Sequence, residues 1–241
     1  CNFACSFCQN WAISQDSPDL APFSSRQAVE AAWQHGSIGI AYTYNEPLVW
    51  FEYVLDTARL AREAGLLNVL VTNGYVNLIP LDELLPFLDG VNLDIKSIRP
   101  AFYRELCHGS LEPVLAFARA VAPRVHLEVT NLIIPGHNDT DEELGELAAW
   151  IAESLGSQTP THLSAYFPRY RLQAPPTALR PAWIPCSMGA VTSRTSLFTI
   201  PGLPGRLRLW ERMTREAAIR MKATMTARYF LNNNAPHLQC R

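Results

Sequence analysis

Residues 38–74 read IGIAYTYNEPLVWFEYVLDTARLAREAGLLNVLVTNG, and this stretch decides the fold class. An apolar run, Ile38–Thr43, precedes a helical pattern, Pro47–Ala64, which stops at Gly65 and is followed by a second apolar run, Asn68–Thr72. Short apolar runs bounded by turn residues are typical of strands buried on both faces. A helix between two such strands predicts a unit in which the strands run parallel.

The same alternation continues on both sides of this unit. Three further strands are predicted at Gly90–Ile95, Val125–Ile134 and His162–Tyr166. Helical patterns lie at Ser25–His35, Leu81–Leu88 and Leu111–Val121 (with Ser110 as its cap), and a capping box, Thr140–Glu143, opens a helix that runs to Ser154. The sequence therefore predicts an α/β fold with a parallel sheet or barrel.

Polar residues stand where several of these strands end. In parallel βα architectures, active sites gather at the carboxyl ends of the strands, so these side chains are candidates for one common site. They are Asn45, Glu46, Thr72, Asn73, Asp94 and Lys96.

Three of the six cysteines crowd the first eight residues, CNFACSFC, at Cys1, Cys5 and Cys8. Three thiolates in a tight loop can hold three corners of a cubic [4Fe-4S] cluster, which leaves the fourth iron open to a small molecule. Two other interpretations stay open. A zinc site would need a fourth ligand, and the nearest histidine is the distant His35; three core residues on a helix face would need less polar neighbours. Clustered thiolates also favour a reducing, cytoplasmic setting.

The segment CNFACSFCQNWAISQ (1–15), together with YTYNEP (42–47), VTNGY (71–75), LDIKS (93–97) and PGHNDTDEE (135–143), resembles the radical S-adenosylmethionine (SAM) superfamily. The likeness is narrower to the branch of pyruvate formate-lyase activating enzyme, and within it to the AmmeMemoRadiSam-system radical SAM enzymes. It covers about residues 1–178. It implies a partial (β/α)6 radical SAM barrel whose first strand would precede Cys1 and is expected to be missing from this chain.

The resemblance also implies roles for individual residues. Cys1, Cys5 and Cys8 would hold the cluster. Val71 replaces an acidic residue of the family, so a cation site there is not expected. Two roles have structural alternatives: Glu46 could cap the following helix, and Asp94 with Lys96 could be an ion pair at a strand end. The residues expected to contact SAM are Asn10, Asn45, Glu46, Thr72, Asn73, Asp94 and Lys96.

The activity implied by the resemblance is reductive cleavage of SAM to methionine and a 5'-deoxyadenosyl radical that abstracts hydrogen from a substrate. The substrate stays open, with a protein among the alternatives, and the electron donor would be a protein such as flavodoxin or ferredoxin. No membrane segment is expected and nucleic acid is not an expected partner. A non-catalytic zinc or iron–sulfur module and an inactive fragment are the rival interpretations.

The pattern breaks after residue 178. Residues 1–178 carry an acidic excess, whereas residues 179–241 are basic and lose the strand-helix periodicity. The sequence therefore predicts a radical SAM partial barrel over 1–178 and an atypical, irregular C-terminal segment over 179–241. Three origins are considered for this segment: out-of-frame translation, a basic extension that binds a partner, or an ordinary but poorly patterned region. We expect it to lack a packed core of its own.

Overall fold

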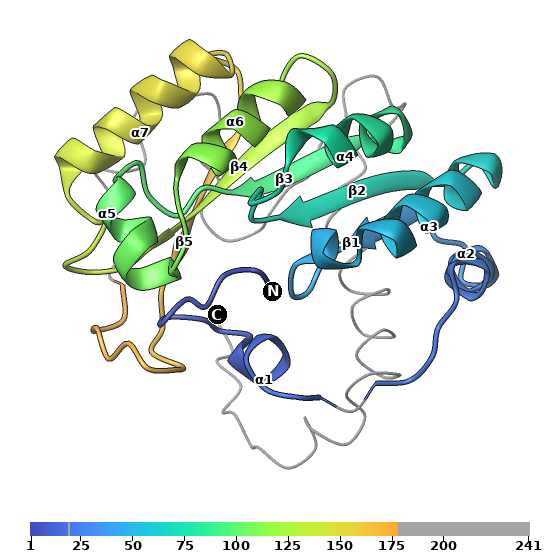
Figure 1. Ribbon diagram of the computed structural model, residues 1–241. Helices are drawn as coiled ribbons and strands as arrows, with labels where there is room; N and C mark the ends of the chain where they lie inside the picture. Colours follow the sequence, from blue (N-terminus) through green and yellow to red (C-terminus); the bar gives the residue numbers. More distant parts are fainter. Residues whose placement is uncertain (19, 178–241) are drawn as a thin grey trace, which may run out of the picture.

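The computed structural model describes residues 1–18 and 20–177, and five strands within them form one sheet (Figure 1). Each strand pairs in parallel with its neighbour in the chain, so the order is β1-β2-β3-β4-β5. The predicted α/β class is confirmed, and the arrangement is that of a partial barrel of βα units. The strands are β1 (Gly39–Tyr42), β2 (Leu67–Thr72), β3 (Gly90–Asp94), β4 (His126–Ile133) and β5 (Thr161–Ala165).

The connections between the strands are helical. The α-helices are α1 (Trp11–Ser14), α2 (Ser25–Gln34), α3 (Phe51–Glu63), α4 (Leu78–Leu84), α5 (Pro100–Phe102), α6 (Glu112–Val121) and α7 (Asp141–Ser154). Short 3-10 turns, η1 (Pro47–Trp50) and η2 (Leu85–Phe87), and a π-helical turn, η3 (Tyr103–Cys107), complete the set. Figure 1 shows α3, α4, α6 and α7 along one side of the sheet, with the N-terminal segment and α1 on the other side.

The two faces of the sheet differ in chemistry. Leu70, Val91, Leu93 and Val129 are at most 2% exposed and are neighbours in the strand register, which makes the helix-covered face a continuous apolar core. Side chains alternate along a strand, so the opposite face receives the polar residues in between. These include Asn92, Asp94, Glu128 and His162.

Two helix starts differ from the predictions, and one predicted capping box is only half formed. The helix expected from Pro47 begins as the 3-10 turn η1, because the Glu46 carboxylate caps the Leu48 amide, and α3 starts at Phe51. Ser110 does not cap α6; its N-cap is Leu111, without a side-chain hydrogen bond. At α7, Thr140 caps the Glu143 amide, but the Glu143 carboxylate accepts a hydrogen bond from the Ser97 hydroxyl instead of completing the box.

Two segments with helical turns were not predicted from the sequence, namely α1 and the run from α5 through η3. Both are short and neither has an amphipathic period long enough to be recognised. The predictions for residues 179–241 lie outside the described part of the chain.

Candidate functional site

The cysteine loop, residues 1–8, is attached to segments that follow strands β3 and β5. The Ala4 amide donates to the Cys107 carbonyl at 3.1 Å, and the Ser6 amide donates to the Leu106 carbonyl at 2.9 Å. The Leu172 amide, beyond β5, donates to the Ser6 carbonyl at 2.8 Å. Main-chain bonds on both sides therefore hold the loop over the carboxyl ends of the strands.

Aromatic packing fixes the first half of this loop. The Phe3 ring is 3% exposed, stacks on Tyr75 at 4.6 Å between centroids and meets Tyr103 edge-on at 5.8 Å. Gly109 is required beneath it, since a Cβ there would lie 2.4 Å from a Phe3 ring carbon. Buried aromatic rings contribute a large share of packing energy, so Phe3 anchors the loop to the body of the fold.

Cys1, Cys5, Cys8 and Cys107 are all free thiols. Cys1 is exposed, and the Asn73 amide nitrogen lies 3.7 Å from its sulfur. The Cys8 sulfur lies 3.2 Å from the Ser14 hydroxyl. Cys5 is buried and pairs with Cys107, whose thiol donates a hydrogen bond that outweighs burial and lowers the pKa of Cys5. Each thiol of the loop thus has its own neighbour.

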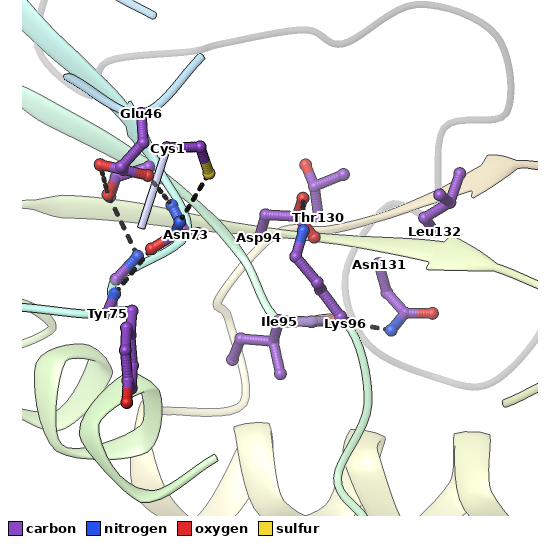
Figure 2. Close-up of polar contacts among 12 residues, drawn as sticks. Cys1, Glu46, Asn73, Tyr75, Asp94, Ile95, Lys96, Thr130, Asn131 and Leu132 are labelled. Atoms are coloured by element: carbon purple, nitrogen blue, oxygen red, sulfur yellow. Dashed lines mark hydrogen bonds and ion pairs between the residues drawn. The ribbon is translucent and has the colours of Figure 1, made fainter. Parts of the chain in front are cut away.

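Glu46 joins the end of β1 to the end of β2 (Figure 2). Its Oε1 accepts hydrogen bonds from the Thr72 hydroxyl at 2.7 Å and the Leu48 amide at 3.1 Å, and its Oε2 accepts from the Asn73 amide at 2.8 Å. Burial outweighs these donors and raises the pKa of Glu46. The cap considered from the sequence is therefore present, as one part of a larger network.

Asn73 extends this network to the cysteine loop. Its side-chain nitrogen donates to the Asn2 side-chain oxygen at 2.9 Å, and its Oδ1 accepts from the Tyr75 amide at 2.8 Å. Figure 2 shows Asn73 between Glu46 and Cys1. One buried amide therefore connects the strand ends to the first cysteine.

Asp94 and Lys96 form the ion pair considered from the sequence, with Nζ and Oδ2 2.6 Å apart. Burial works to lower the pKa of Lys96, but the Asp94 carboxylate and the thiolates of Cys5 and Cys107 raise it overall. The ammonium also lies 5.9 Å from the centroid of the Phe7 ring. Among the described residues the second oxygen of Asp94, Oδ1, is buried without a hydrogen-bond partner, which leaves an acceptor for a ligand.

Asn10 and Asn45 are both hydrogen-bonded to residues of α1. Asn10 is exposed and precedes this helix, and its carbonyl accepts the amides of Ile13 and Ser14. The Asn45 side-chain nitrogen donates to the Ile13 carbonyl, and its oxygen accepts the Glu46 amide at 2.8 Å. The structure thus brings together the predicted residues from the loop and from the ends of β1, β2 and β3.

Two residues of this region were not predicted. Cys107 is fully buried against Cys5, and the buried Tyr103 hydroxyl accepts the Lys96 amide at 3.0 Å. Both belong to η3, about one hundred residues from the cysteine loop. The only local signal was that a lone cysteine and an aromatic residue follow the third predicted strand.

The described residues contain no group of three or more His, Cys, Asp or Glu side chains placed to hold a metal ion. The donor chemistry nevertheless fits an iron–sulfur cluster, because three free thiols share one eight-residue loop and thiolates are the ligands such clusters take. The unpartnered Asp94 oxygen next to this loop fits an additional polar ligand. To hold a cluster, Cys5 and Cys8 would exchange their present partners for iron.

Within residues 1–18 and 20–177, none of the helices has the length and apolar character required to cross a membrane.

Comparison with known families and curated proteins agrees with this geometry. The family model of the radical SAM superfamily matches residues 1–151. A protein of Methanocaldococcus jannaschii, MJ0808, is 42% identical over 184 residues, which are 74% of this chain and 54% of the relative. The pyruvate formate-lyase 1-activating enzyme of Escherichia coli K12 is 30% identical over 131 residues, 53% of each chain. The chain spans about half the length of these relatives.

Solved structures agree on the fold. A domain of the pyruvate formate-lyase-activating enzyme from Bacteroides vulgatus superposes with a TM-score of 0.50 at 22% identity, over 57% of this chain and 84% of that domain. SuiB of Streptococcus suis, solved with S-adenosylmethionine, superposes with a TM-score of 0.55 at 14% identity, over 71% of this chain and 40% of SuiB. These identities are low, so the two structures support the architecture alone.

Proposed function

Since the chain belongs to the radical SAM superfamily, we propose that it binds a [4Fe-4S] cluster through Cys1, Cys5 and Cys8 and cleaves SAM reductively. The bound cluster would supply the electron that splits SAM into methionine and a 5'-deoxyadenosyl radical, which then removes hydrogen from a substrate. The single observation that carries this proposal is the juxtaposition of a three-thiol loop with Asp94 and its unpartnered oxygen.

The chain's own residues would position SAM and exclude water. A free carboxylate oxygen on Asp94 can accept a hydroxyl or ammonium hydrogen, and Lys96 is a cation able to meet a carboxylate. Glu46 has both oxygens engaged by Thr72, Asn73 and Leu48. We therefore propose that Glu46 acts mainly by shaping the backbone beside SAM, with the side chains of Asn10 and Asn45 flanking α1 as further contacts.

The test is an anaerobic preparation in which iron, sulfide and zinc are counted, followed by a dithionite-dependent assay for 5'-deoxyadenosine. We expect roughly four iron and four sulfide per chain and conversion of SAM only under reductant. Cys5→Ala should remove both cluster and cleavage. Ser6→Ala is the matched control, because the Ser6 hydroxyl has no partner among the described residues. Stoichiometric zinc, or a full cluster in Cys5→Ala, would contradict the assignment.

The substrate we propose is a protein, and the electron donor a flavodoxin or ferredoxin. Support comes from the relatives named as activating enzymes of pyruvate formate-lyase, whose alignments cover 53% and 63% of this chain. Purified pyruvate formate-lyase can serve as the probe, with the radical signal recorded by electron paramagnetic resonance. Formation of 5'-deoxyadenosine without any protein radical would reject this substrate for the chain while leaving SAM cleavage intact.

A further inference from the structure

Cys107 is the one described cysteine outside the cysteine loop, and it faces the buried member of that loop. Cys107 is 0% exposed and Cys5 is 7% exposed. The two thiols act on each other's pKa, which is lowered at Cys5 and raised at Cys107. The main-chain bonds from Ala4 and Ser6, on either side of Cys5, end on the carbonyls of Cys107 and Leu106.

The surroundings of this pair hold it in place. Phe7 packs on Phe102 with ring centroids 5.6 Å apart, and Phe3 packs on Tyr103, so aromatic contacts bracket Cys5 and attach the loop to α5 and η3. Lys96 lies close enough that both thiolates influence it. A disulfide needs the two Cα atoms within about 7 Å of each other, and the main-chain bonds on either side of Cys5 bring its backbone against that of Leu106 and Cys107.

We propose that Cys5 and Cys107 form a reversible disulfide in the chain that lacks a cluster, and that this bond is a modification site. A sulfur in a disulfide cannot also bind iron as a thiolate. The disulfide and the proposed cluster are therefore mutually exclusive states of Cys5. The bond itself stands on the geometry of the pair, whereas its effect on cluster loading rests on the proposed function.

The reaction balances with a small-molecule disulfide, such as glutathione disulfide, as the oxidant. The Cys5 thiolate attacks one sulfur of the oxidant, forms a mixed disulfide and releases one thiolate. The Cys107 thiolate then attacks the Cys5 sulfur and releases the second thiolate. Two electrons pass from the protein to the oxidant, and two protons leave the protein thiols. Both sulfurs are buried, so the first attack requires the cysteine loop to move away from η3.

The first experiment maps the bond in the full chain without a cluster. The protein is equilibrated in a glutathione redox buffer, remaining thiols are alkylated, and disulfide-linked peptides are identified by mass spectrometry without reduction. We expect a peptide containing Cys5 linked to one containing Cys107, lost on addition of dithiothreitol. Cys5 linked instead to Cys1, Cys8 or a cysteine beyond residue 177, or Cys107 alkylated throughout, would overturn the inference.

The second experiment asks what the bond does. Oxidised protein and reduced protein are given iron and sulfide anaerobically, and the iron bound is counted. We expect oxidised wild type to take up less than a tenth of the iron bound by reduced wild type. Oxidised Cys107→Ala should instead carry a glutathione adduct at Cys5, because no thiol is left at position 107 to resolve the mixed disulfide. Cys107→Ala that loads no iron even when reduced would make Cys107 a ligand and overturn the proposal.

The two proposals fail in distinguishable ways. If the mapped bond is present but reduced wild type binds no cluster, the disulfide stands and the proposed function fails. If reduced wild type loads a cluster and cleaves SAM while no Cys5–Cys107 peptide is found, the proposed function stands and the disulfide is wrong. Should Cys107→Ala fold poorly, Cys107→Ser provides the same comparison, and the peptide map of wild type needs no variant.

Discussion

Two buried glutamates lie at opposite ends of the same sheet, Glu46 after β1 and Glu128 near the start of β4. They are 2% and 1% exposed, respectively. Glu46 accepts hydrogen bonds from a hydroxyl and two amides, all neutral donors. The carboxylate oxygens of Glu128 lie 3.1 Å from His126 Nε2 and 2.7 Å from His162 Nε2. Burial raises the pKa of Glu46, whereas at Glu128 the two imidazoles outweigh burial and lower the pKa.

The two glutamates have different roles: Glu46 helps to position the proposed site, and Glu128 contributes to the stability of the fold. The Glu46 network connects two strand ends to the cysteine loop through Asn73, where the proposed site lies. The Glu128 triad, made of Glu128, His126 and His162, joins β4 to β5 at the amino ends of the strands. In barrels of βα units, chemistry gathers at the carboxyl ends and the amino ends serve stability. The two glutamates follow that division.

The largest expected effect is on stability, from Glu128→Leu. This variant removes an acceptor shared by two imidazoles, and removing one partner of a buried pair costs about 3–5 kcal/mol of unfolding free energy. Denaturant unfolding of the full chain measures it. Glu128→Gln keeps an oxygen acceptor and should cost less. Glu153→Leu, at an exposed position of α7, is the control and should change stability by less than about 0.5 kcal/mol. Equal stability of Glu128→Leu and wild type would contradict the role of the triad.

A smaller effect, on cluster retention, is expected from Asn73→Ala. This change removes the side-chain bond to Asn2 and the amide next to Cys1, while the main-chain bond to Glu46 remains. Groups that orient metal ligands are worth about 10-fold to 100-fold in affinity, so we expect iron to be lost to a chelator about ten times faster. Asn77→Ala is the matched control, since Asn77 is exposed and makes no side-chain cap bond. If Asn73→Ala and wild type lost iron to the chelator at the same rate, Asn73 would have no role in holding the cluster.

Local signals in the sequence were enough to predict the strands and one site pair. Strand positions were predicted to within a residue or two, because apolar runs and turn residues are local signals. The ion pair between Asp94 and Lys96, considered from the sequence as the alternative to a role at SAM, is present, since alternation along a strand puts both on one face. The contacts that hold the cysteine loop were not predictable. Phe3 meets Tyr75 and Tyr103, and Cys5 meets Cys107, across seventy to one hundred residues of chain. Contacts between residues so far apart in the chain leave no signal in the local sequence.

The Glu128 triad was missed for the same reason. His126 and Glu128 lie two residues apart on one strand, but His162 comes from the next strand and is brought to them by the register that pairs it with Thr130. From the sequence alone the histidines had no evident partners. A carboxylate and two imidazoles on the same face of neighbouring parallel strands become a unit only once the strand order and register are known.

The smallest expected effect is in the pH dependence of stability, and it has opposite signs at the two glutamates. A lowered pKa in the fold means that Glu128 stabilises the protein above the ordinary glutamate pKa, about 4.3, and that this contribution is lost as pH falls through the lowered value. A raised pKa at Glu46 means that stability is lost as pH rises from the ordinary value through the raised one. A tenfold difference in proton affinity between the folded and the unfolded chain corresponds to about 1.4 kcal/mol of unfolding free energy.

These signs can be read from unfolding free energies of wild type, Glu46→Gln and Glu128→Gln between about pH 2 and pH 7, a range that includes pH values below the ordinary glutamate pKa. The cost of Glu128→Gln should grow as pH rises above the lowered pKa, because wild type gains stability that the amide cannot gain. The cost of Glu46→Gln should shrink over the same range, because wild type loses stability as its buried carboxyl ionises. The charged groups that act on these pKa values are Lys96 at Glu46, and His126 with His162 at Glu128. If the cost of the two substitutions changed with pH in the same direction, the neutral donors at Glu46 and the imidazoles at Glu128 would not affect the two carboxylates differently. The proposed electrostatic difference between the two ends of the sheet would then be wrong.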